Sequence, residues 1–163
     1  MRAHPSKLFR PLAGRVPIII RLLAALLLFA ACSHPTYEGE VVAVLDGDRF
    51  LFNYVGGQLE VALADSYTVG LDQSYGDAAR AALARLIGNH KVRITVLDQP
   101  SSRRVVARVM MNGKNVSAAL VRQGYAWVSR KYADDNDLYW MELDARTRNV
   151  GLWARMEKVP KEP

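Results

Sequence analysis

Residues 112–127 read NGKNVSAALVRQGYAW, a stretch in which a turn leads directly into a helix with a defined end. Asn112, Gly113 and Lys114 have the composition of a tight turn. The residues after them read as a short helix that Gly124 ends. The stretch therefore predicts a turn joined to a short helix, with a strand entering the turn from the N-terminal side.

Two strands and a helix are predicted before this turn. Residues 103–111, RRVVARVMM, alternate inward and outward side chains as a half-buried strand does. Residues 91–98, KVRITVLD, are rich in the β-branched side chains that favour strands. Residues 74–90 read as a helix with a stop at Gly88-Asn89. The apolar stripe of this helix consists of Ala79, Ala82, Leu83 and Leu86.

Three more strands are predicted nearer the N-terminus, at residues 39–46, 49–55 and 59–65, with VGGQ between the last two as a hairpin turn. A last helix is expected at about residues 137–150. Five strands with a helix after the third follow the order of an oligonucleotide-binding (OB) type barrel. We therefore predict an α+β fold, a five-stranded OB-fold-type β-barrel with about three helices.

The net charge of +6 does not predict a polyanion partner. Residues 1–31 contain five of the 22 basic residues and no acidic residue, which leaves 17 bases against 16 acids in the rest of the chain. The basic residues of the leader are Arg2, Lys7, Arg10, Arg15 and Arg21. A nearly neutral domain gives no electrostatic argument for nucleic acid, so nucleic-acid binding is possible but not favoured.

The basic stretch and the apolar segment IIIRLLAALLLFAAC predict a secretory signal. Cys32, the only cysteine, follows two alanines, and this resembles the cleavage site of bacterial lipoproteins. We expect a lipoprotein-type signal peptide at residues 1–31, a lipidated Cys32, a short tether at 32–37, the domain at 38–154 and a tail at 155–163. The alternative is an ordinary signal peptidase site that leaves Cys32 as a free thiol.

A lipidated Cys32 determines the expected location and one partner. The protein would be secreted across the inner membrane and lipid-anchored in the cell envelope, with the membrane as a partner through the anchor. Ser33 after the cysteine, instead of aspartate, resembles lipoproteins sorted to the outer membrane, where the domain would face the periplasm. The sequence identifies no protein partner.

Asp46, Gly47 and Asp48 follow the first predicted strand, in VLDGDRF at residues 44–50. Such a triplet is either half of a metal site or only a turn, because aspartate and glycine are both common turn residues. We expect Gly47 to adopt a backbone conformation that other residues resist. His34 and His90 have no second histidine or cysteine at ligand spacing, so zinc is not expected.

Several motifs in this order resemble the staphylococcal nuclease-like, or thermonuclease, family over residues 38–154. They are DGD after the first strand, QSYG at the first helix, RVVARV on the fifth strand, NGKNVSAALVRQGYAW, and ELDARTRNVGLW near the end. The resemblance implies a domain that cleaves DNA and RNA phosphodiesters with one calcium ion. It also implies two metal carboxylates, two phosphate-binding arginines and a glutamate base.

Most of these residues are absent when the family motif V-R-L-x-G-I-D-x-P-E is placed on VALADSYTVG, residues 61–70. Ala62 takes the place of an arginine, Tyr67 that of the second metal aspartate, and Gly70 that of the base. Only Asp48, as a residual metal ligand, and Arg104, as a residual catalytic arginine, match the family. We therefore expect little or no calcium-dependent activity, since loss of a general base alone removes about 10²–10⁴ in rate.

A shift of two residues makes Asp65 the second metal ligand and keeps it on the same strand face as Tyr67. It still leaves Glu60 at the arginine and Thr68 at the base. Two functions from different classes remain open. The first is an envelope lipoprotein whose nuclease-like barrel is a binding or structural module, a pseudoenzyme without a cofactor. The second is a secreted Ca²⁺-dependent nuclease with a rearranged site formed by Asp46, Asp48, Asp65, Asp72 and Arg104.

Two other groups of residues are assigned to surface and core. The basic residues Arg103, Arg104, Arg108, Arg122, Arg130 and Lys131 could bind phosphate if the fold gathers them, but we expect solvated faces. The tryptophans Trp127, Trp140 and Trp153 are predicted to be packing anchors and not platforms for bases.

Overall fold

The computed structural model describes residues 34–68 and 75–154. Several predictions lie outside these residues: the signal peptide with Cys32 and Ser33, the two loop residues Gly70 and Asp72, and the tail at 155–163. Within the two described ranges, no helix is long and apolar enough to cross a membrane.

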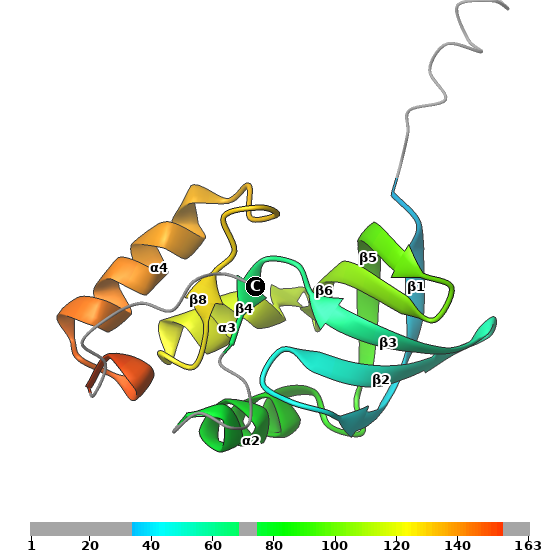
Figure 1. Ribbon diagram of the computed structural model, residues 1–163, viewed down its shortest axis with the longest axis horizontal. Helices are drawn as coiled ribbons and strands as arrows, with labels where there is room; N and C mark the ends of the chain where they lie inside the picture. The colour runs from blue at the N-terminus through cyan, green and yellow to red at the C-terminus, as the bar shows by residue number, and fades with distance from the viewer. Residues whose placement is uncertain (1–33, 69–74, 155–163) are drawn as a thin grey trace, which may run out of the picture. The chain divides into compact units, whose positions relative to one another are not determined.

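Five strands form a closed barrel, as the sequence predicts (Figure 1). They are β1 (Thr36–Val44), β2 (Arg49–Tyr54), β3 (Gly57–Leu63), β5 (Lys91–Ser101) and β6 (Arg104–Met111). Neighbours pair antiparallel in the order β3-β2-β1-β5-β6. A parallel pairing of β3 with β6 closes the barrel. The prediction of an α+β fold with an OB-type barrel is confirmed.

The interior of the barrel is built from the inward-facing residues of each strand. Val105, Ala107 and Val109 of β6 are at most 2% exposed, which confirms the alternation predicted from the sequence. Phe50 and Phe52 of β2 are fully buried and meet edge to face, with ring centroids 6.5 Å apart. Each such aliphatic or aromatic side chain stabilises the fold by about 1.5–3 kcal/mol.

Three α-helices occur in the described part of the chain: α2 (Gly76–Ile87), α3 (Val116–Arg122) and α4 (Asn136–Thr147). The predicted stripe of α2 is buried at Ala79, Ala82 and Leu83, whereas Leu86 is only partly buried. In Figure 1, α3 and α4 lie to one side of the barrel strands, and α2 lies below them.

The quoted turn and helix form as predicted. Lys114–Asn115 is a short strand, β7, that pairs with β6. The side chain of Asn115 then caps α3 by accepting a hydrogen bond from the backbone N–H of Ala118. Gly124 lies two residues beyond Arg122, with φ +72°, and the 3₁₀ helix η1 (Gly151–Ala154) packs against its backbone. A Cβ at Gly124 would stand 2.3 Å from the carbonyl oxygen of Val150, so only glycine fits there.

Two short strands that the sequence did not predict connect the barrel to the helices. Strand β4 (Ser66–Tyr67) pairs antiparallel with β8 (Trp127–Val128). The ring of Tyr67 stacks on Trp127, with centroids 5.6 Å apart. This pairing fixes the segment that carries the family's second metal position.

Two sequence predictions need correction. Strand β1 begins at Thr36, which pairs with Thr95, so the last two residues of the predicted tether belong to the sheet. Trp140 on α4 is 68% exposed and is not a packing anchor. Trp127, 1% exposed, and Trp153, partly buried against it, do pack as predicted.

Candidate active site

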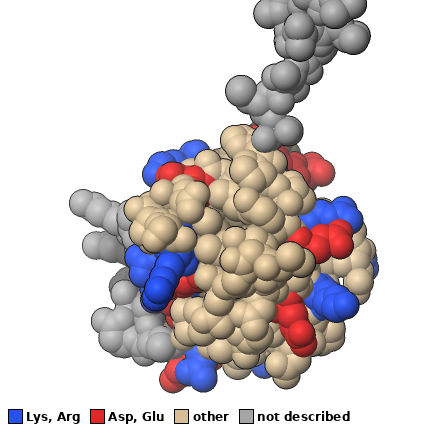
Figure 2. All heavy atoms as spheres, turned by 90° about the vertical axis from the view of Figure 1, so that its right-hand side faces the viewer, with Lys and Arg blue, Asp and Glu red and all other residues tan. Residues whose placement is uncertain are grey.

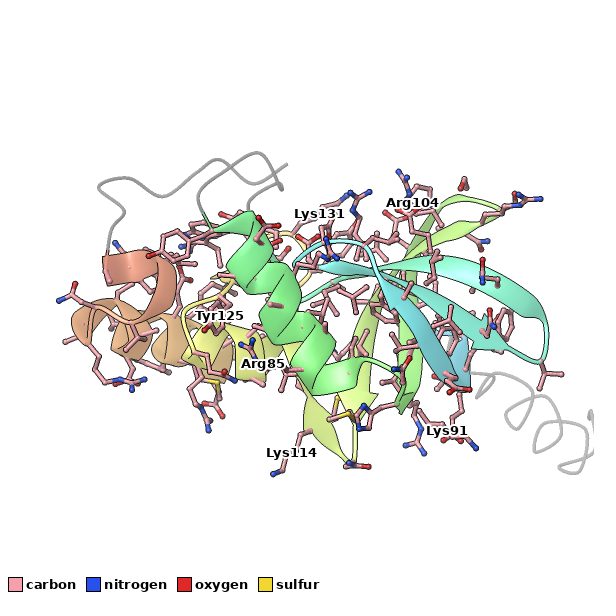
Figure 3. All side chains as sticks on the ribbon, turned by 90° about the horizontal axis from the view of Figure 1, so that it is seen from below. Arg85, Lys91, Arg104, Lys114, Tyr125 and Lys131 are labelled. Atoms are coloured by element: carbon pink, nitrogen blue, oxygen red, sulfur yellow. The ribbon has the colours of Figure 1, made fainter. Side chains whose placement is uncertain are left out.

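A pocket of about 650 Å³ opens beside the DGD turn. It brings together Asp46, Asp48 and Arg104 of the proposed rearranged site. Its other lining residues are Arg49, Ala62, Leu63, Ser66, Tyr67, Thr68, Asp98, Pro100, Val106, Lys131 and Tyr132. Arg104 and Lys131 lie on the same side of the molecule (Figure 3). The candidate site is therefore a groove between the barrel and the segment that follows β8.

Asp46 is buried, and both of its carboxylate oxygens are hydrogen-bonded. Oδ1 accepts from the backbone N–H groups of Asp48 (3.1 Å) and Arg49 (2.8 Å), and Oδ2 accepts from Arg49 Nε (2.6 Å). Burial alone would raise the pKa of Asp46, but the hydrogen bonds from Arg49 and Asp48 outweigh it and hold this pKa below its usual value. Asp46 is thus an ionised carboxylate whose charge and hydrogen bonds are satisfied by neighbouring groups of the protein.

Gly47 is required in the turn for lack of space and not for backbone conformation. It is not among the glycines with positive φ, so the expectation about its conformation is wrong. A Cβ at this position would stand 2.6 Å from Thr68 Oγ1 and 2.7 Å from the Cβ of Ala79. The DGD turn therefore packs directly against α2 and against the segment after β4.

Asp48 faces the pocket with a weaker set of partners. Its Oδ2 accepts a hydrogen bond of 2.6 Å from the backbone N–H of Thr68. Burial, together with the hydrogen bond and negative charge of the neighbouring Asp46, raises the pKa of Asp48 to about 7. Asp48 is therefore about half protonated near pH 7, whereas Asp46 stays ionised.

Arg49 is a pocket residue that the sequence analysis did not identify. In the β2–β3 ladder it lies directly opposite Ala62, the position where the family motif has an arginine. Its guanidinium pairs with Asp46 and, through Nη1, with Glu60 Oε1 at 3.2 Å. The predicted turn did not indicate this neighbour, because pairing the strands around VGGQ at residues 55–58 would place Arg49 opposite Ala64. The ladder instead pairs Tyr54 with Gly57, which brings Arg49 opposite Ala62.

Arg104, the family arginine that the sequence retains, is also held by Glu60. Its Nε lies 3.1 Å from Glu60 Oε1 and its Nη2 lies 3.4 Å from Oε2. Two guanidinium groups thus converge on one carboxylate from strands on either side of β3. In the alignment shifted by two residues, Glu60 takes the position of a family arginine. In the structure its side chain binds Arg49 and Arg104.

Asp65 does not join this pocket. It is 1% exposed and receives hydrogen bonds from Arg108 Nε (3.1 and 3.0 Å), Arg108 Nη2 (2.9 Å) and Asn115 Nδ2 (2.8 Å). Its role in the structure is to tie the end of β3 to β6 and to the start of α3. Of the five residues of the rearranged site, the structure brings three together and leaves Asp65 apart, and Asp72 lies outside the described residues.

The far rim of the pocket is polar and of mixed charge. Tyr132 donates a hydrogen bond of 2.7 Å to Asp98 Oδ2, which lowers the pKa of Asp98. Lys131 Nζ lies 3.9 Å from the same oxygen. On the barrel face seen in Figure 2, basic and acidic side chains are likewise interspersed, without a large patch of one sign.

The described residues do not fit a calcium ion at this site. Calcium is held by six to eight oxygens, usually with several carboxylates among them. Of the carboxylates that line the pocket, Asp46 is bound by Arg49 and Asp98 accepts a hydrogen bond from Tyr132, which leaves Asp48. Within the described ranges, no group of three or more His, Cys, Asp or Glu side chains could hold a metal ion.

The fold and pocket define a class, the OB-type barrels with a nuclease-like site beside the first strand. The family model described as "Staphylococcal nuclease homologue" matches residues 60–155, more than half of the chain, and the chain belongs to this family. The match begins at Glu60, after the DGD turn.

Two of three similar bacterial proteins carry nuclease names. An "Uncharacterized endonuclease" of Haemophilus influenzae is 26% identical over 151 residues, which cover 92% of this chain and 84% of that protein. "Protein ParB" of Escherichia coli is 32% identical, with 83% of this chain and 84% of that protein covered. A "Micrococcal nuclease" of Shigella flexneri is 30% identical, with 80% and 82% covered.

Proposed function

We propose that this chain is an envelope lipoprotein whose nuclease-like domain has little or no calcium-dependent nuclease activity and serves as a binding or structural module. The observation that carries the proposal is Tyr67, which stands at the family's second metal position with its ring stacked on Trp127. A phenol held in this way is a poor substitute for a calcium-binding carboxylate. A fold alone does not confer activity, so nuclease-like architecture is compatible with this reading.

The pocket also lacks the phosphate-binding arrangement that the family resemblance implies. Ala62 provides no guanidinium, and Arg104 is paired with Glu60. A phosphate that enters the pocket would have to displace this carboxylate. Removing one charge-stabilising donor costs on the order of 10²–10³ in rate in enzymes of other families.

The test is a nuclease assay on residues 34–163, the compact unit that contains the whole barrel. Single-stranded and double-stranded DNA and RNA are incubated with millimolar CaCl₂ or with EDTA, beside staphylococcal nuclease as a positive control and the variant Asp48→Ala. We expect no calcium-dependent cleavage above the level of Asp48→Ala. Cleavage by the wild type that Asp48→Ala abolishes would overturn the proposal.

A second candidate is a calcium-dependent nuclease with a rearranged site, and two observations favour it. Asp46, Asp48 and Arg104 line one pocket, and two of the similar proteins, those of Haemophilus influenzae and Shigella flexneri, are called an endonuclease and a nuclease. Against it stands the buried pairing of Asp65 with Arg108. The same assay distinguishes the two candidates, because only the second predicts activity that depends on Asp48.

The envelope location is proposed from the sequence of the leader. Labelled palmitate supplied to bacteria that express the full chain should enter the wild type and not Cys32→Ser. After membrane fractionation, the wild type should be recovered with the outer membrane. Equal partition of both proteins into the aqueous phase of a detergent extraction would contradict the lipid anchor.

A further inference from the structure

The Asp46 carboxylate is unusual in a pocket of this kind because it has no free oxygen directed at a ligand. Two backbone N–H groups bind Oδ1, and the Arg49 guanidinium binds Oδ2 through Nε and Nη2. A guanidinium that binds one carboxylate through two of its nitrogens is among the stronger charge-assisted contacts in proteins. Arg49 therefore holds a carboxylate that a divalent cation would need.

The position of Arg49 makes this contact part of the fold. Its Cα pairs with Ala62 across the β2–β3 ladder, and the small alanine leaves room beside it for a long side chain. On the opposite side, Glu60 Oε1 lies 3.2 Å from Nη1. Asp46 and Glu60 thus hold the guanidinium from two sides, while 42% of the side chain stays exposed to the pocket.

Two neighbouring carboxylates without a cation between or beside them repel each other. Asp46 and Asp48 are such a pair, separated by one residue and both partly or fully withdrawn from water. Either a positive charge or a proton relieves this repulsion in the folded state. The described residues offer Arg49 at bonding distance from Asp46.

We propose that Arg49 is the resident cation of this pocket, taking the place that a divalent ion would have on the Asp46–Asp48 pair. Arginine stays charged at all ordinary pH values and cannot dissociate, unlike a metal ion. The Asp46 carboxylate is then permanently neutralised without a metal. A corollary is that removal of the positive charge at residue 49 should create a divalent-cation site that the wild type lacks.

The experiment compares Arg49→Gln with Arg49→Lys in the unit of residues 34–163. Glutamine keeps a hydrogen-bond donor but removes the charge, whereas lysine keeps the charge. Arg103→Gln is the matched control, since Arg103 is an exposed arginine on the β5–β6 turn that does not line the pocket. Thermal unfolding is followed by circular dichroism in EDTA and in rising CaCl₂ at constant ionic strength.

We expect Arg49→Gln to melt below the wild type in EDTA and to recover as calcium saturates it, by roughly 3–8 °C once the ion is well above its Kd. The wild type, Arg49→Lys and Arg103→Gln should not respond to calcium. Adding Asp48→Asn to Arg49→Gln should abolish the response, because that change removes one of the two carboxylates.

Three results would overturn the proposal. The first is a saturable calcium shift in the wild type that Asp48→Asn removes. The second is a folded Arg49→Gln protein that shows no calcium response. The third is an Arg49→Gln protein that fails to fold with calcium as well as without it, because the ion should then replace the guanidinium.

The role proposed for Arg49 is independent of the proposed function, and different results would contradict each of them. Nuclease activity in a wild type that binds no calcium would overturn the proposed function and leave Arg49 as the resident cation. Calcium binding by the wild type without cleavage would overturn the role of Arg49 and leave the absence of activity intact.

Discussion

Replacing Arg108 with methionine should destabilise the domain more than any change to a surface arginine. Arg108 donates three hydrogen bonds of 2.9–3.1 Å to Asp65, a carboxylate that is 1% exposed. In the Arg108→Met variant, Asn115 would still bond to this buried charge but would not neutralise it. Breaking a buried pair from one side costs about 3–5 kcal/mol. The second partner of Arg108, Asp134, is 75% exposed and adds only about 0–1 kcal/mol.

The assay is urea unfolding of residues 34–163, followed by tryptophan fluorescence, because Trp127 is buried and reports loss of the fold. The matched control, Arg103→Met, should stay within about 0.5 kcal/mol of the wild type. The double variant Asp65→Asn, Arg108→Met should be more stable than Arg108→Met alone, since it removes the uncompensated charge. An Arg108→Met variant within about 1 kcal/mol of the wild type would refute the reasoning.

Two more predictions concern the DGD turn. The pKa of Asp48 in the folded protein, about 7, lies above its usual value of 3.8. Between pH 3.8 and about pH 7, Asp48 is protonated in the folded state and ionised in the unfolded state. The free energy of unfolding therefore falls as pH rises through this range. Asp48→Asn should stabilise the domain by about 1–3 kcal/mol near pH 8 and hardly at all near pH 4, as measured by urea unfolding at both pH values. An equal effect at both pH values would contradict the raised pKa. Gly47→Val should cost about 1–3 kcal/mol, because its side chain would meet Thr68 and Ala79. Differential scanning calorimetry checks this, and an unchanged melting temperature would show that the turn has room to move.

The barrel could be predicted from sequence because its strands carry their own signals. Val105, Ala107 and Val109 alternate regularly, and the helix after the third strand has a clear apolar stripe with a stop. By contrast, β4 and β8 contain two residues each, too few for any periodicity to be detected. Trp140 was misassigned because a single tryptophan on an amphipathic helix carries no information about which face is covered.

The site could be predicted only in part, because its decisive contacts join residues far apart in the chain. The sequence analysis predicted Asp48 and Arg104 as site residues, and the structure brings both to one pocket. The departures from the family at Ala62 and Tyr67 stay predictions. The sequence analysis did not identify Glu60 as the shared partner of two arginines, 44 residues before one of them. Such a contact depends on the parallel pairing of β3 with β6, which local propensity does not specify.

The same contacts explain how a nuclease-like pocket can remain stable without a ligand. Charged groups that converge on an empty pocket repel one another or lose hydration, and either effect destabilises the fold. In this chain two of these groups have an internal partner of opposite charge: Asp46 is held by Arg49, and Arg104 is held by Glu60. Tyr67 adds an uncharged ring that packs on Trp127. A pocket with these pairings needs neither a metal nor a phosphate for stability, and a ligand of either kind must compete with a partner already in place.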